Sequence, residues 1–181
     1  MPSQPKLEHR GEQPYVAIRT RMTMKELAAG AGDELFPEVL AWLGKQGVAP
    51  DGAPFIRYLV IDMDAVLEMD WGVAVPEPLP GDDRVRPGVL PAGRYATMVY
   101  TGPYGGDGLI GANAALRGWA KENGVAWEVR EGDHGDVWGA RMEFYLTNPA
   151  AEPNPHAWRT EIAYLVAEDR TGDSHEATTE R

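Results

Sequence analysis

The chain has 181 residues, and 17 Lys and Arg against 28 Asp and Glu give it a formal net charge of −11. This acidity disfavours nucleic acid and anionic membrane surfaces as partners, because both need a basic face. The absence of cysteine excludes disulfides, thiolate metal sites and a cysteine nucleophile. With no signal-like start and no long apolar run, the sequence predicts a cytoplasmic protein. The four histidines lack metal-ligand spacing, so we expect neither a metal nor a cofactor.

Composition along the chain predicts one folded domain between two irregular ends. We expect a flexible lead-in over 1–12, a single domain over 13–167, and a disordered acidic tail over 168–181. Within the domain, a proline-rich connector separates two halves that we treat as modules. The boundaries are 13–75 for module one, 76–92 for the connector and 93–167 for module two.

Strands are predicted where apolar and polar residues alternate, and helices where a cap residue precedes an apolar stripe. The predicted elements of module one are a strand (14–22), a helix opened by Thr23 and Glu26, a helix capped by Asp33, and two strands (54–62 and 65–75). Those of module two are a strand (94–101), a helix (107–123), a short strand near Trp127, and two strands (138–147 and 159–167).

The order strand–helix–strand–strand therefore occurs twice, with a weak echo in sequence. Tyr15-Val-Ala-Ile is followed 80 residues later by Tyr95-Ala-Thr-Met. The helix end Ala41-Trp-Leu-Gly-Lys-Gln-Gly is followed 77 residues later by the helix end Gly118-Trp-Ala-Lys-Glu-Asn-Gly. Chance similarity is the alternative to duplication. Duplication predicts an α+β fold of two modules about a pseudo-twofold axis, with an antiparallel sheet, helices on one face and a ligand groove on the other.

Two short motifs allow a chemical or a structural interpretation, and we favour the structural one for both. Gly106, Gly108 and Gly111 match the G-x-G-x-x-G pattern of dinucleotide sites, but the parallel strand–helix–strand unit that such a site needs is missing. Asp62 and Asp64 resemble a metal-binding pair, yet a turn between adjacent strands also favours Asp. His134 lies in a polar, glycine-rich segment typical of an exposed loop.

Several acidic and aromatic side chains fall on the strand face that we expect to be free of helices. They are Glu68 and Asp70 in 65–75, Glu143 and Tyr145 in 138–147, and Glu161 in 159–167. Aromatic walls with a carboxylate suit an organic cation. A partly desolvated carboxylate could also act as an acid–base group. The alternative is that these acids line a solvated sheet face and keep the protein in solution.

The sequence resembles the GyrI-like small-molecule-binding superfamily, which includes the effector-binding domains of multidrug-responsive transcription regulators. The resemblance rests on 14-PYVAIRTRM, 54-APFIRYLVID, 93-GRYATMVYTGPYGG, the helix ends at Trp42 and Trp119, Phe144-Tyr-Leu-Thr-Asn-Pro and Thr160-Glu-Ile. It implies two strand–helix–strand–strand modules and binding of bulky, often cationic, aromatic compounds in a central groove. It also implies that Glu161, on the last strand, and Tyr145, before the Asn-Pro turn, contact the ligand.

From this we expect a stand-alone binding protein for hydrophobic, cationic aromatic compounds, since no helix-turn-helix segment precedes residue 14. The predicted ligand-binding residues are Glu161, Tyr145, Asp70, Glu68 and Tyr58. Some members of the family hydrolyse cyclopropane-bearing natural products with an acid and a tyrosine, so the alternative is a hydrolase of such compounds that uses Glu161 and Tyr145. A protein-sequestering accessory role is a third possibility. Nothing in the sequence selects for that role or fixes the oligomeric state.

Overall fold

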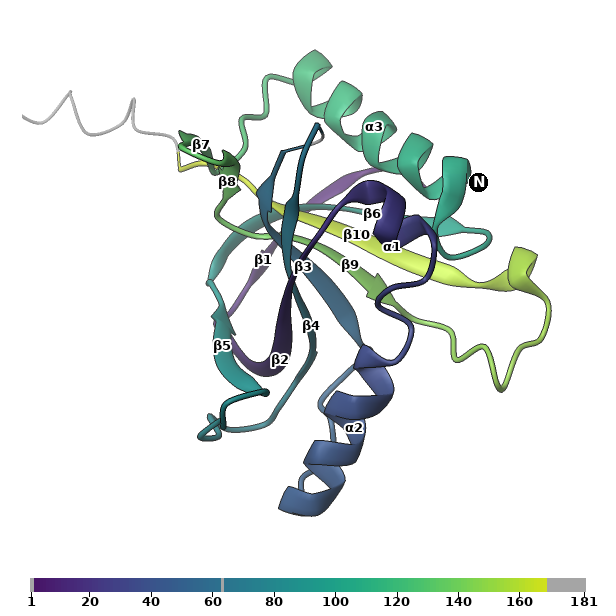
Figure 1. Cartoon of the computed structure of the whole chain (residues 1–181). Coiled ribbons are helices and arrows are strands. Elements are labelled where there is room, and N and C mark those ends of the chain that lie inside the picture. The colour runs from purple at the N-terminus through teal and green to yellow at the C-terminus, as the bar shows by residue number, and fades with distance from the viewer. Residues whose placement is uncertain (1, 63, 169–181) are drawn as a thin grey trace, which may run out of the picture.

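The computed structural model describes residues 2–62 and 64–168 (Figure 1). The N-terminal half consists of β1 (Lys6–Arg10), β2 (Gln13–Met22), α1 (Met24–Ala28), α2 (Leu35–Gln46), β3 (Phe55–Ile61), β4 (Leu67–Ala74) and β5 (Arg86–Leu90). The C-terminal half consists of β6 (Gly93–Thr101), α3 (Gly106–Glu122), β7 (Val129–Gly132), β8 (Gly135–Trp138), β9 (Arg141–Tyr145), the 3₁₀ turn η1 (Pro155–Ala157) and β10 (Arg159–Leu165). The predicted strands and helices are found, with shifted ends. The tail predicted over 168–181 lies outside the described residues except for Glu168.

The strands form one antiparallel sheet that curls into a half-barrel. Its order is β1-β6-β10-β9-β3-β4-β2-β5, and the β7–β8 hairpin attaches to β3. Only residues 91–92 join β5 to β6, although these strands stand near opposite ends of that order. The sheet therefore has to bend until its two ends meet. Across the bend, the Arg57 guanidinium of central β3 donates to the carbonyl oxygen of Val89 on edge strand β5 at 2.9 Å.

The two halves of the chain contribute their strands in matching order when the sheet is followed outward from its centre. β3 and β9 pair at the centre, with Phe55 opposite Phe144. From this pair, β4 and β2 follow on one side and β10 and β6 on the other. This is the order that two copies of a strand–helix–strand–strand module would produce. The duplication itself stays a prediction.

Both longer helices cover the same, convex face of the sheet. α2 packs on β4 and β2, and α3 packs on β6, so the two helices lie well apart with the central strands between them (Figure 1). Each helix buries an apolar stripe against its own half of the sheet, which gives two convex-side cores. A third core fills the concave face around Phe55, Tyr95 and Met142.

The helix ends test two of the predicted caps. At α1 the Thr23 hydroxyl accepts from the backbone N–H of Glu26 at 3.1 Å and the Glu26 carboxylate accepts from that of Thr23 at 3.0 Å, so the predicted capping box is confirmed. The predicted Asp33 cap of α2 is wrong, because Glu34 occupies the cap position and its side chain makes no cap hydrogen bond. α2 ends at Gly47, whose φ of 69° suits glycine.

Two segments expected to be irregular contain edge strands. Residues 1–12 include β1, which pairs with β6, and the connector 76–92 includes β5, which pairs with β2. β1 has the sequence KLEHR, without apolar alternation, and β5 contains Pro87 and Gly88. Edge strands are held by backbone pairing on one side and tolerate proline, so their sequences carry little strand signal.

The glycine motif at the start of α3 has a packing role. The ladders on either side of α3 are antiparallel, so the parallel unit required by a dinucleotide site does not form. A Cβ at Gly108 would overlap the hydroxyl of Tyr100, whereas one at Gly111 would meet open space. Among the described residues no helix is long and apolar enough to cross a membrane.

Candidate functional site

Glu143 lies on β9 at the centre of the sheet, where the two halves meet. It stands opposite Ile56 of β3 on one side and Ile162 of β10 on the other. Its side chain points to the convex face, between the halves covered by α2 and α3, and it is only 6% exposed. Burying a carboxylate here removes its water shell and has to be offset by hydrogen bonds or an opposite charge.

Three neutral donors surround the Glu143 carboxylate. The hydroxyls of Tyr58 on β3 and Tyr145 on β9 each donate to Oε1 at 2.8 Å, and the Asn113 side-chain amide on α3 donates to Oε2 at 2.9 Å. The Asn113 carbonyl oxygen accepts in turn from the Tyr164 hydroxyl at 2.7 Å. The carboxylate is therefore held from both sheet halves and from α3.

Burial and the nearby charge keep these tyrosines protonated. Burial raises the pKa of Tyr58 and of Tyr145 well above the usual value, and the negative charge of Glu143 raises both further. Both hydroxyls therefore remain hydrogen-bond donors at neutral pH. Among the described residues, no Lys, Arg or His forms an ion pair with Glu143.

A row of aromatic rings extends from this cluster over the convex face. The Tyr145 ring lies 5.8 Å from Phe36 of α2, which lies 5.3 Å from Trp71 of β4. On the other side, Tyr145 lies 5.0 Å from Tyr104, which lies 4.8 Å from Trp158. Hydrophobic residues of both convex-side cores pack against Tyr145. The result is a buried carboxylate bordered by aromatic rings, a combination that can accommodate a lipophilic cation.

Of the five residues predicted to bind ligand, the structure brings Tyr58 and Tyr145 together at Glu143. It separates them from Glu161. β10 pairs Thr160 with Tyr145 and Glu161 with Phe144, so Glu161 and Tyr145 lie on opposite faces of the sheet. The predicted placement of Glu143 and Tyr145 on the helix-free face was wrong. Both faces of β9 are buried, so its alternation of residue types did not reveal which face lies under the helices.

On the concave face, Glu161 is paired with an arginine of the N-terminal strand. The Arg10 guanidinium lies 2.6 Å from Glu161 Oε1 and also 2.6 Å from Glu8 Oε1. It covers the rings of Tyr95 and Phe144, 5.7 and 5.8 Å from their centroids. Burial lowers the pKa of Arg10, but the two carboxylates outweigh this, so its pKa is raised overall. Beside this group lies a hollow of about 360 Å³.

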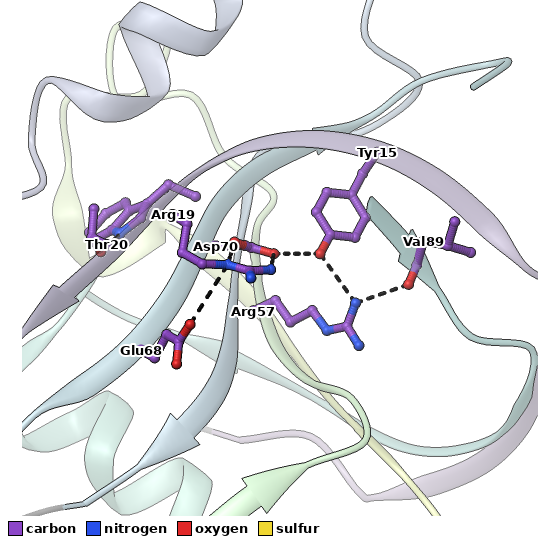
Figure 2. Close-up of polar contacts among 8 residues, drawn as sticks. Tyr15, Arg19, Thr20, Arg57, Glu68, Asp70 and Val89 are labelled. Carbon is purple, nitrogen blue, oxygen red and sulfur yellow. Dashed lines mark hydrogen bonds and ion pairs between the residues drawn. The ribbon is translucent and has the colours of Figure 1, made fainter. Parts of the chain in front are cut away.

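Asp70 and Glu68 belong to a second concave-face network, on β4. Arg19 donates to Asp70 Oδ1 at 2.9 Å and Oδ2 at 3.2 Å, and the Tyr15 hydroxyl donates to Oδ2 at 2.6 Å. Figure 2 shows Asp70 between these partners, with Arg57 beyond the Tyr15 hydroxyl. Glu68 lies 4.0 Å from Arg19. These acids, like Glu161, therefore already have arginine partners.

The sequence-based prediction missed Glu143 and Asn113 as site residues. The strand pattern predicts Glu143 on the helix-free face, but the family resemblance points to Glu161 as the acidic contact. The available signal was Asn113, a polar residue within the stripe of α3 that buries Leu109, Ala112 and Leu116. A polar side chain in such a stripe requires a buried partner.

The remaining motif residues take local roles. The Asp62 carboxylate accepts from the backbone N–H of Asp64 at 3.1 Å, as expected for a turn residue. His134 is exposed between β7 and β8. Within residues 2–62 and 64–168, no group of three or more His, Asp or Glu side chains is placed to hold a metal ion.

Comparisons with known proteins agree with this fold. The chain matches the C-terminal domain of EcmrR at 19% identity with a TM-score of 0.75, covering 92% of this chain and 98% of that one. It matches SAV2435, whose structure was solved bound to tetraphenylphosphonium, at 10% identity with a TM-score of 0.62, covering 96% and 98%. It matches a hydrolase from Listeria innocua at 16% identity with a TM-score of 0.57, covering 91% and 92%.

The match to EcmrR concerns one part of that protein. In the EcmrR–DNA complex the chain covers 58% of the EcmrR length, at 19% identity with a TM-score of 0.71. No curated protein sequence matches. The family model of the GyrI-like small molecule binding domain matches residues 3–166, and the chain therefore belongs to the GyrI-like family.

Proposed function

We propose that this protein binds bulky, hydrophobic, cationic aromatic compounds on the convex face, with Glu143 supplying the counter-charge. The site would lie where the two modules of the proposed duplication meet. The family assignment supports a small-molecule ligand, and the phosphonium bound to SAV2435 supports a lipophilic cation. The proposal needs no nucleic acid or membrane partner and fits a cytoplasmic protein of net charge −11.

Glu143 has no ion-pair partner among the described residues, and this observation carries the proposal. Of the two carboxylates that are buried among the described residues, Asp70 has Arg19 and Glu143 has no ion-pair partner. A buried carboxylate held only by neutral donors retains strong attraction for a cation, because little water screens it. A ligand cation beside Glu143 would thus gain a charge pair that the free protein lacks.

The rings bordering Tyr145 would supply the rest of the binding energy. The faces of Phe36, Trp71 and Tyr104 can attract a delocalised cation and bury its apolar surface. Phe36 of α2 and Tyr145 of β9 meet through a tilted ring contact, with 59° between the ring planes. Such a contact can part without breaking a hydrogen bond, so the row between α2 and β9 is a route by which a flat or propeller-shaped ligand could enter.

Isothermal titration calorimetry with tetraphenylphosphonium tests the proposal. Glu143→Gln keeps the shape of the side chain but removes its charge, and it should weaken binding about 30-fold, or about 2 kcal/mol. Glu161→Gln is the matched control on the opposite face and should bind like the wild type. Equal binding by the wild type and Glu143→Gln would reject the role of Glu143. Loss of binding only in Glu161→Gln would instead support the sequence-based assignment of the ligand to Glu161.

The direct hydrogen bond between Tyr145 and Glu143 favours hydrolysis as a second candidate function. For a cyclopropane conjugated to a carbonyl group, Glu143 would take a proton from water as the water oxygen bonds to a ring carbon. The ring bond would break with its electron pair moving toward the carbonyl oxygen, which would take the proton of Tyr145. This replaces the predicted Glu161–Tyr145 pair, whose members lie on opposite faces.

Mass spectrometry of such an electrophile after incubation with enzyme tests the second candidate. Addition of one water at a rate that falls at least about 100-fold in both Glu143→Gln and Tyr145→Phe would support it. Product formed equally by the wild type and Tyr145→Phe would reject it. Tyr104→Phe is a suitable control, because it alters a neighbouring tyrosine that does not bond to Glu143.

A further inference from the structure

Arg141 lies on the same strand and the same face as Glu143, two residues earlier, inside a box of aromatic rings. Its guanidinium carbon lies 4.6 Å from the ring centroid of Trp138, 4.7 Å from that of Tyr164 and 6.0 Å from that of Tyr58. The two charged side chains of β9 therefore border one another on the convex face. Tyr58 lies next to both side chains: its ring faces Arg141, and its hydroxyl donates a hydrogen bond to Glu143.

Two N–H groups of this box lack a hydrogen-bond partner among the described residues. Arg141 Nε and Trp138 Nε1 are buried and make no hydrogen bond to any described residue. Arg141 also forms no ion pair within the described part of the chain. A buried N–H without an acceptor is costly and uncommon, and here two such groups occur on side chains in direct contact. Burial lowers the pKa of Arg141, which reflects the same loss of solvent.

Arg141 and Glu143 could satisfy each other, yet they do not. Alternate residues on one face of a strand are about 7 Å apart, within reach of an arginine. Instead, Glu143 is held by two tyrosines and Asn113, while Arg141 is held between rings. A second guanidinium, that of Arg117, donates to the Tyr164 hydroxyl at 3.2 Å on the same side of the box. The convex face thus carries a negative end at Glu143 and a positive, donor-rich end at Arg141.

We propose that Arg141 and Trp138 form an acceptor subsite that binds a carboxylate or carbonyl oxygen of the ligand whose cationic aromatic part contacts Glu143. The ligand class would then be dipolar: aromatic cations that also carry an acid or carbonyl group. This inference rests on the proposed function, because it places the subsite beside the same Glu143. An oxygen there would satisfy both unpartnered N–H groups and give Arg141 the negative partner that it lacks.

Rhodamine B and its ethyl ester provide a matched pair of probes, since they share the cationic ring system and differ in whether the carboxylate is free. Fluorescence polarisation titrations at constant ionic strength would compare their affinities. The wild type should bind the free acid about tenfold more tightly than the ester. Arg141→Gln should abolish this preference while retaining binding of the ester. Arg130→Gln, which makes the same change at an exposed arginine of β7, should keep the preference.

Trp138→Phe gives a second, milder test, because it keeps an aromatic ring near Arg141 and removes the indole N–H. It should reduce the preference for the free acid by a few fold. A wild type that binds both dyes equally, or a preference that survives in Arg141→Gln, would overturn the subsite and leave the role of Glu143 intact. Binding of neither dye would remove the cation site itself and the subsite with it.

Discussion

Tyr58 of β3 and Glu143 of β9 are joined by a hydrogen bond of 2.8 Å, although 85 residues separate them in sequence. β3 and β9 form the central pair of the sheet, so this bond connects the two halves at the proposed site. Tyr145 and Asn113 complete the same cluster from β9 and α3. Changes at the site should therefore alter the stability of the whole domain as well as its binding.

The free energy of unfolding should fall at alkaline pH through Tyr58 and Tyr145. Burial and the charge of Glu143 raise their pKa in the folded protein, whereas an unfolded tyrosine titrates near about 10. Above that pH the unfolded chain releases protons that the folded chain retains. The stabilisation that each tyrosine provides is thus complete below about pH 10. Above that pH it decreases, for each tyrosine, by up to about 1.4 kcal/mol per pH unit.

Urea unfolding of the wild type and Tyr58→Phe between pH 9 and pH 11.5 measures this effect. The wild type should lose stability more steeply with rising pH than Tyr58→Phe, and the double variant with Tyr145→Phe should be flatter still. Identical slopes in the three proteins would show that neither tyrosine has a raised pKa.

Asn113→Ala should destabilise the fold by about 3 kcal/mol, because it leaves Glu143 Oε2 and the Tyr164 hydroxyl without their partner in a buried place. Chemical denaturation monitored by tryptophan fluorescence checks this value. Asn123→Ala, which removes an exposed side-chain bond to the Trp119 carbonyl, is the control and should cost at most about 0.5 kcal/mol. Equal losses in both variants would contradict the buried network.

The two acids of β4 should differ sharply in their effect on stability. Asp70 is 4% exposed and binds Arg19 and the Tyr15 hydroxyl, so Asp70→Asn should cost about 2 kcal/mol. Glu68 reaches Arg19 only at 4.0 Å with its side chain partly in solvent, so Glu68→Gln should change stability by less than about 0.5 kcal/mol. Thermal unfolding of the two variants compares them. A larger loss in Glu68→Gln would contradict the geometry in Figure 2.

Alanine substitutions at two glycines of α3 should change the stability of the fold in opposite directions. A Cβ at Gly108 would overlap the Tyr100 hydroxyl and force a shift in a packed site, at a cost of about 1–3 kcal/mol. A Cβ at Gly111 meets open space, and alanine is the better helix former by up to about 1 kcal/mol. Gly108→Ala should therefore lower, and Gly111→Ala raise, the midpoint of thermal unfolding. Stabilisation by both would show that Gly108 has no packing role.

The regular elements and most strand faces could be predicted because they depend on local patterns. Apolar residues of β4 and β10 alternate, so Asp70 and Glu161 were correctly assigned to the face without helices. β1 and β5 escaped prediction because edge strands depend on pairing. The side chains of β9 were predicted on the wrong faces. Met142 and Glu143 are both buried although they point to opposite faces, so alternation in this strand does not distinguish a buried face from an exposed one.

The sequence by itself determined the α+β class, the order of the elements and the resemblance to the GyrI-like family. The curled sheet decided which of the two buried carboxylates among the described residues lacks an ion-pair partner. Arg19 reaches Asp70 because β2 pairs with β4, and Arg10 of β1 reaches Glu161 of β10 although β6 lies between these strands. Glu143 is left to neutral hydrogen-bond partners from β3, β9 and α3. Charge pairing depends on distances of a few ångströms between residues far apart in sequence, and only the tertiary structure sets those distances.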